Sequence, residues 1–170
     1  MKAPGSKFRR EKRGREPIWR RLKIEPLEHR RVLATIVVNS DDPATTAPDD
    51  GIISFRDALA ESNSSPEVDT IVFANTVTRL EDIGVTVRAP VVIDGTGVTI
   101  ASGFLTQATI HVRNHTGTTI TNFTFEQASN TSAAILVDGG EGHTISGNRF
   151  QGPTGSSRVG LGVEISDSCH

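Results

Sequence analysis

Three segments in the second half of the chain repeat one order of residues every 20 to 25 positions. They read VVIDGTGVTIASGF (91–104), IHVRNHTGTTITNFTF (110–125) and ILVDGGEGHTISGNRF (135–150), and the shorter GLGVEIS (160–166) follows them. Each of the three begins with a β-rich triplet that leads into Asp or Asn. A turn containing glycine comes next, then the pair Thr-Ile, and then a Phe. Short strands and turns at this period are typical of a β-solenoid.

The repeat predicts three columns of equivalent side chains, one coil above the next. They are Ile100, Ile120, Ile145 and Ile165; Phe104, Phe125 and Phe150; and the turn residues Asp94, Asn114 and Asp138. A single coil is too small to bury its own apolar face, so stacked coils would build a continuous core from such columns. The strands of an antiparallel sandwich also recur, roughly every 8–12 residues, but a sandwich does not predict this longer register.

The residues around Phe123 predict a change of direction inside the repeat. Ile120 and Phe125 differ in parity along the chain, so a turn or bulge must lie between them if both point inward. We expect Asn122 or Asn148 to lie in such turns and to form an amide ladder between coils.

The segment before the repeats predicts a strand, a helix and a second strand. Ile36–Val38 is short and β-branched, and residues 69–73 (DTIVF) have the same character. Between them, a helix is expected from Ser54 to about Ser62. Ser54 with Asp57 three positions later forms a start like a capping box, and the apolar residues that follow share one helix face. Such a unit would cover the exposed strand edges and apolar columns at one end of a solenoid.

The same region resembles a known family of surface proteins. Asp50-Gly51, SFRDAL (54–59) and DTIVF (69–73) are similar to the opening strand, helix and "DTIxF" strand of CSLREA-type proteins. In this chain Ile53 replaces the signature cysteine and Phe55 replaces leucine. The resemblance covers about residues 36–150. It implies a right-handed parallel β-helix of the pectin-lyase type behind an N-terminal cap.

The charge of the chain divides it near residue 33. Residues 1–33 carry a net charge of +8 and the remainder carries −10, within a total of −2. Residues 1–21 mix Pro, Gly and charge without apolar periodicity, which predicts an unstructured leader. Three interpretations are open: a solvated tail, a nucleic-acid arm, which the acidic body would oppose, and a targeting element.

Residues 23–34 favour targeting. KIEPLEHRRVLA resembles the planctomycete extracellular-protein motif, with Ile24 where leucine is usual. The resemblance implies export. No apolar run approaches the length of a membrane-spanning helix, and the single cysteine, Cys169, excludes an intrachain disulfide.

The sequence therefore predicts an all-β fold in three parts. Residues 1–34 are a disordered basic leader with the targeting motif, residues 35–80 an N-terminal cap, and residues 81–170 the coils of the β-helix. No C-terminal cap is visible before Ser168-Cys169-His170. We expect frayed last coils, pairing of this edge with another chain, or a truncated gene product.

The candidate chemical groups are sparse and scattered. His111 and His115 flank a strand-to-turn segment and need not share a face, so metal binding is not expected. Asp94, Asn114 and Asp138 suit turn geometry better than a Ca²⁺ site. Glu141, Glu164 and Asp167 show no spacing of a glycosidase pair. Asn-x-Ser/Thr sequons begin at Asn63, Asn114, Asn122 and Asn130, where Asn-rich coils explain them. We predict no catalytic, metal-binding or cofactor-binding residues.

The composition favours a surface scaffold over a sugar-cleaving enzyme. Beyond the leader the aromatic residues are six Phe, with no Trp or Tyr to hold sugar rings, and there is no Lys. We predict an exported cell-surface or extracellular protein with a structural or interaction role. Its expected partners are a surface polysaccharide or another protein chain at the open C-terminal edge, with no nucleic acid and no transmembrane segment. The alternative is a polysaccharide lyase or glycoside hydrolase, or an inactive remnant of one.

Overall fold

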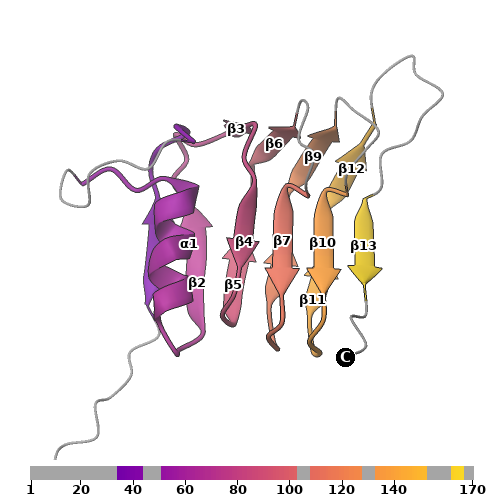
Figure 1. Ribbon diagram of the computed structural model, residues 1–170. Helices are drawn as coiled ribbons and strands as arrows, with labels where there is room; N and C mark the ends of the chain where they lie inside the picture. The colour runs from indigo at the N-terminus through magenta and orange to yellow at the C-terminus, as the bar shows by residue number, and fades with distance from the viewer. Residues whose placement is uncertain (1–33, 44–50, 103–107, 128–132, 153–161, 167–170) are drawn as a thin grey trace, which may run out of the picture. The chain divides into compact units, whose positions relative to one another are not determined.

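The computed structural model describes residues 34–43, 51–102, 108–127, 133–152 and 162–166. All of them belong to one compact unit, Arg31–His170. They form 13 strands and one helix, drawn in Figure 1. The predicted leader, residues 1–33, and Phe104 lie outside the described residues.

Three parallel sheets make up the unit, and the strands of each sheet lie side by side in the following order. Sheet A contains β1 (Thr35–Val38), β2 (Asp69–Phe73), β5 (Val91–Asp94), β8 (Thr119–Thr121) and β11 (Thr144–Ser146). Sheet B contains β3 (Arg79–Glu81), β6 (Thr99–Ser102), β9 (Thr124–Gln127) and β12 (Arg149–Gln151). Sheet C contains β4 (Val85–Val87), β7 (Ile110–Arg113), β10 (Ile135–Asp138) and β13 (Val163–Ser166).

From β2 onward the chain visits the sheets in the order A, B, C and then begins again. We call each such set of three strands a coil: the first is β2–β4, the second β5–β7, the third β8–β10 and the fourth β11–β13. Within these coils every pairing joins a strand to its counterpart in the next coil, and every pairing is parallel. The predicted all-β parallel β-helix is therefore confirmed.

Like residues stack in columns inside the coils, one column or more for each sheet. Sheet A places Ile36, Ile71, Ile93, Ile120 and Ile145 in register. Sheet B places Leu80, Ile100, Phe125 and Phe150 in register. Sheet C stacks Val85, Ile110, Ile135 and Val163, and beside them Val87, Val112, Val137 and Ile165. Most of these side chains are fully buried, and burying one of this size contributes about 1.5–3 kcal/mol.

Two of the predicted columns were assigned wrongly. Ile120 and Ile145 do stack, but Ile100 belongs to sheet B beneath Phe125, and Ile165 belongs to sheet C. Asp94 lies in sheet A opposite Thr121, on a different sheet from Asp138. Asp138 pairs with Arg113, so Asn114 is one position further along. The predicted stack of Phe125 on Phe150 is confirmed, with ring centroids 5.2 Å apart and planes 7° apart.

The error has a simple physical origin. VVID (91–94) has the same β-branched pattern as IHVR (110–113) and ILVD (135–138), but it is a strand of sheet A and they are strands of sheet C. All three sheets bury one face against the same core, so their strands carry the same alternation. The pattern identifies a strand without identifying its sheet.

The predicted change of direction before Phe125 lies at Asn122. This residue adopts a left-handed backbone (φ 64°) between β8 and β9, and Ile120, Phe123 and Phe125 are all buried around it. The expected amide ladder is absent at this corner, because Asn122 lies above Gly147 and not above Asn148. Asn148 instead bonds the backbone of the coil before it: its Nδ2 donates to the Ile120 carbonyl and its Oδ1 accepts from the Phe123 N–H, both at 2.9 Å.

Helix α1 (Phe55–Ser64) begins where the sequence predicts it and packs on β1, β2 and β4 at the N-terminal end of the stack (Figure 1). Ser54 is the N-cap, and its hydroxyl and the Asp57 carboxylate form a complete capping box. Phe55, Ala58 and Leu59 are buried in the same core as the strand columns. The Phe55 ring lies 5.2 Å from that of Phe73, which continues the core into the helix.

Asn63 in the last turn of α1 pairs with the outer edge of β4. Its side-chain Nδ2 donates to the Thr86 carbonyl at 2.9 Å, and its Oδ1 accepts from the Arg88 N–H at 2.7 Å. A neighbouring parallel strand would offer one acceptor and one donor to these same two groups. The amide of Asn63 therefore replaces a strand at an edge that would otherwise be open to another chain.

Removing this amide is expected to destabilise the protein. Asn63→Ala leaves two backbone groups of the β4 edge without partners and should lower the free energy of unfolding by about 1–3 kcal/mol. Asn63→Asp keeps the acceptor for the Arg88 N–H and loses the donor to Thr86, so it separates the two bonds. Urea unfolding followed by circular dichroism measures both variants. Unchanged stability in Asn63→Ala would contradict this role.

Candidate functional site

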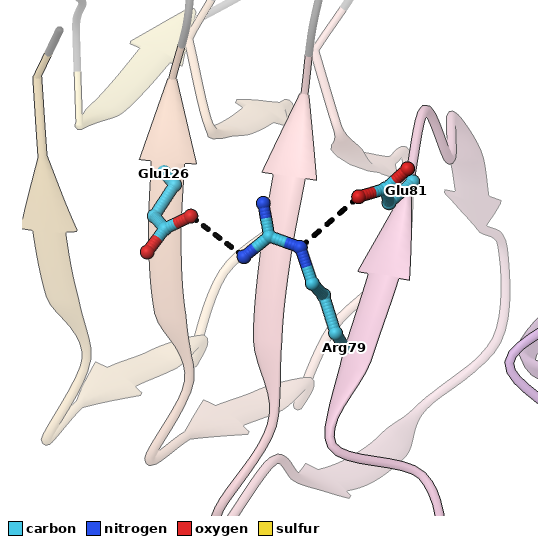
Figure 2. Close-up of polar contacts among 3 residues, drawn as sticks. All are labelled: Arg79, Glu81 and Glu126. Carbon is cyan, nitrogen blue, oxygen red and sulfur yellow. Dashed lines mark hydrogen bonds and ion pairs between the residues drawn. The ribbon is translucent and has the colours of Figure 1, made fainter.

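The outer face of sheet B carries a charged cluster that sequence reasoning did not identify. Arg79 on β3 donates from Nε to Glu81 at 3.0 Å and from a terminal nitrogen to Glu126 on β9 at 2.8 Å (Figure 2). To reach β9 the guanidinium crosses β6, where the residues in register are Thr99 and Ala101, both short. The hydrogen bonds that Arg79 donates to Glu126 and then to Glu81 raise the pKa of Arg79.

This cluster lies in solvent, since its three side chains are 41% to 69% exposed. Exposed ion pairs are screened by salt and contribute little to stability. Both carboxylates accept hydrogen bonds from the one guanidinium of Arg79. The cluster links β3 to β9 across the intervening strand β6.

The outer face of sheet C brings His111, Arg113 and Asp138 together. His111 Nε2 lies 3.7 Å and Arg113 Nε lies 3.6 Å from the same oxygen, Asp138 Oδ2. Both distances exceed those of direct hydrogen bonds. Burial, followed by the charge of Arg113, lowers the pKa of His111, and Asp138 opposes this only in part. At neutral pH the imidazole is therefore uncharged, as a general base must be.

A pair of histidines, His115 and His143, lies at the corner where the chain passes from sheet C to sheet A. His115 Nδ1 lies 3.0 Å from the Arg113 carbonyl, and its Nε2 bonds the hydroxyl of Thr118. One coil later, His143 Nδ1 lies 3.3 Å from the Thr118 nitrogen. The two imidazole rings meet edge to face with centroids 5.4 Å apart.

The structure separates His111 and His115, which stand four residues apart in the sequence. His111 lies on the outer face of sheet C and His115 lies in the turn after it, so each has different neighbours. Within the part of the chain that the structure describes, no three His, Cys, Asp or Glu side chains converge as metal ligands. Asp94 has a turn role: Asn122 and Thr96 donate to its carboxylate and lower its pKa.

The remaining sequence candidates are dispersed. Glu141 and Glu164 are exposed on the third and fourth coils, and Asp167 lies outside the described residues. Among the sequon asparagines, Asn63 uses its side chain to bond the β4 edge, and Asn122 donates from its side chain to Asp94. Asn130 lies outside the described residues. Sequence reasoning missed His143, although it follows Thr118 at the same 25-residue interval that separates Ile145 from Ile120. That interval was the available signal.

The fourth coil exposes apolar residues that the earlier coils bury. Phe150 is 40%, Val163 37% and Ile165 74% exposed, whereas their register partners Phe125, Ile135 and Val137 are at most 5% exposed. The inward columns therefore continue to the outer edge of β12 and β13. Among the described residues this is where apolar side chains of the core reach solvent.

Comparisons with known proteins give no relative from which a role could be transferred. No protein-family model, no curated protein sequence and no solved structure matches this chain. No helix among the described residues has the length and apolar character needed to span a membrane.

The histidine corner depends on a glycine, and this dependence is testable. Gly140 has φ +87°, and a Cβ there would overlap the His115 carbonyl oxygen, whereas Gly97 has φ +80° and open space around it. Gly97→Ala should lower the free energy of unfolding by about 1–2 kcal/mol, which is the strain of a left-handed backbone in a residue with a Cβ. Gly140→Ala should cost about 2 kcal/mol more, because the two coils must separate. Equal thermal stability of the two variants would refute the close contact.

The half-buried imidazole of His111 predicts a pH dependence. Because its folded pKa is below the unfolded value of 6.5, its contribution to stability is complete above that pH and is lost as the pH falls through that value. The free energy of unfolding should therefore decrease between about pH 7.5 and about pH 5. In His111→Gln the decrease should be smaller. Urea titrations at both pH values measure it, and an identical decrease in the two proteins would contradict the prediction.

Proposed function

We propose that the chain is an exported protein of the cell surface or extracellular space with a structural or interaction role. Two features of the sequence support export: the resemblance of residues 23–34 to the planctomycete extracellular-protein motif, and the change from basic leader to acidic body at the same place. The resemblance of the following segment to CSLREA-type surface proteins supports the same location.

The exposed edge of the fourth coil is the observation that carries the interaction role. At the other end of the stack, α1 packs on β1, β2 and β4, and Asn63 satisfies the edge of β4. At the fourth coil, Phe150, Val163 and Ile165 offer apolar contacts beside strands whose outer edges face no other described strand. Addition of a strand at such an edge supplies affinity through main-chain bonds and specificity through alternate side chains.

The interaction role is tested with the 170-residue chain by light scattering after size-exclusion chromatography. The mass should rise with protein concentration, and Ile165→Lys should abolish the rise. Val37→Lys is the matched control. Val37 is also exposed, but it lies on β1, the edge strand of sheet A at the N-terminal end of the stack. A monomer at every concentration would reject association between copies through this edge.

Export is tested separately in the native cell. Intact-mass measurement of the protein recovered from the cell surface or medium should show a chain that begins near Ala34. Full-length protein found only in the cytoplasm would reject export and leave the interaction role to be judged by itself.

A second function, cleavage of a polysaccharide, is favoured by His111, Arg113 and Asp138. A neutral imidazole beside a carboxylate and a guanidinium has the composition of an acid–base site that acts on an acidic sugar. The purified chain should then release reducing ends from one member of a panel of acidic and neutral glycans. Asp138→Asn should abolish the release, and Glu126→Gln on sheet B should not. No release from any glycan would reject this function.

A further inference from the structure

In their neutral forms, the two histidines at the corner between sheets C and A carry the ring proton on different nitrogens. The Thr118 N–H is a donor, so His143 Nδ1 must accept from it, and the proton of a neutral His143 is then on Nε2. The Arg113 carbonyl is an acceptor, so His115 Nδ1 must carry its proton. The hydroxyl of Thr118 can either donate to or accept from His115 Nε2.

The two rings therefore respond differently to acid. A second proton on His115 goes to Nε2, where the Thr118 hydroxyl can turn to accept from it. A second proton on His143 goes to Nδ1, where it meets the Thr118 N–H, and two donors then face each other. The other nitrogen of His143, Nε2, is buried without a partner, so it offers no compensating bond.

Thr118 links the third and fourth coils at this point. Its carbonyl accepts from the Thr144 N–H at 2.8 Å, and its own N–H has His143 as its acceptor. Thr118 is 1% exposed, so water cannot replace a lost partner while the corner stays closed. Protonation of both rings would also place two positive charges at a centroid separation of 5.4 Å.

The charged groups on the neighbouring elements do not supply a matching negative charge in the described contacts. Arg113 at the end of β7 and Asp138 at the end of β10 pair with each other at 3.6 Å. In the same turn as His143, Glu141 uses its carbonyl to accept from the Gly117 N–H, and its side chain is exposed. The corresponding turn after the first coil carries Arg88, which is exposed.

We propose that the His115–His143 corner is an acid-sensitive contact that holds the fourth coil to the third when His143 is neutral and releases it when His143 is protonated. The contact requires an unprotonated Nδ1 on His143 and is lost when a proton binds there. This inference stands on the corner geometry and does not depend on the proposed export or on catalysis.

Hydrogen exchange of the Thr118 amide tests the proposal in a His111→Gln background, which removes the other described acid-sensitive histidine. Between about pH 7.5 and about pH 5 the protection factor of this amide should fall by up to about tenfold per pH unit, because proton binding competes directly with the bond. The Thr99 amide, which donates to Thr78 between the first two coils, is the internal control and should not change.

Adding His143→Gln should remove the pH dependence, because a glutamine carbonyl can accept from the Thr118 N–H and does not titrate. Adding His115→Gln should preserve it. Thr118 protection that is constant with pH, or that falls equally in the His143→Gln variant, would overturn the proposal.

Long-range proton–nitrogen spectra of the unsubstituted chain provide a readout that does not depend on folding of a variant. At about pH 7.5 they should show the Nε2–H tautomer for His143 and the Nδ1–H tautomer for His115. An Nδ1–H tautomer at His143 would also overturn the proposal.

Discussion

Stacking of each coil on the next is the interaction on which the rest of this structure depends. A coil of three short strands encloses too little volume for a core of its own, so the inward side chains of the inner coils are buried between their counterparts in the neighbouring coils. The strands are parallel and in register, so the backbone bonds and the apolar columns follow the same direction. Stability is then shared between neighbouring coils, and the spacing of the coils sets the distances between residues of any site on the surface.

The two ends of the described stack differ in how they are covered. On one side, α1 fills the space of a further coil with Phe55, Ala58 and Leu59, and the Asn63 amide takes the bonds of a missing strand. On the other, the sheet B and sheet C columns reach solvent at Phe150 and Ile165. We therefore place the proposed interaction role at the fourth coil, which the His143 corner joins to the third coil.

Much of the fold could be predicted from the sequence because local chemistry and the repeat agree. The capping box at Ser54, the strand at 69–73 and the stack of Phe125 on Phe150 each follow from residue types at short spacing or from the repeat. The sheet to which each strand belongs could not be predicted. Ile100 and Ile120 have the same residue type and the same Thr before them, but they lie on different sheets.

The polar clusters were harder to predict than the core, because their members meet only after the register is fixed. Arg79 and Glu126 are 47 residues apart and become neighbours because β6 offers two short side chains between them. His143 and Thr118 meet because the turns 114–118 and 139–143 are equal in length. Neighbouring side chains on the outward face of a solenoid are therefore predicted from the positions of residues within their coils and not from proximity in the sequence.

The register of the coils is tested most directly by backbone and side-chain nuclear Overhauser contacts in the isotopically labelled chain. The structure predicts contacts of Ile120 with both Ile93 and Ile145, contacts of Ile100 with Leu80 and Phe125, and none between Ile100 and Ile145. Contacts that pair consecutive strands of one coil in antiparallel fashion, with Ile120 remote from Ile93 and Ile145, would contradict the parallel stack and everything derived from it.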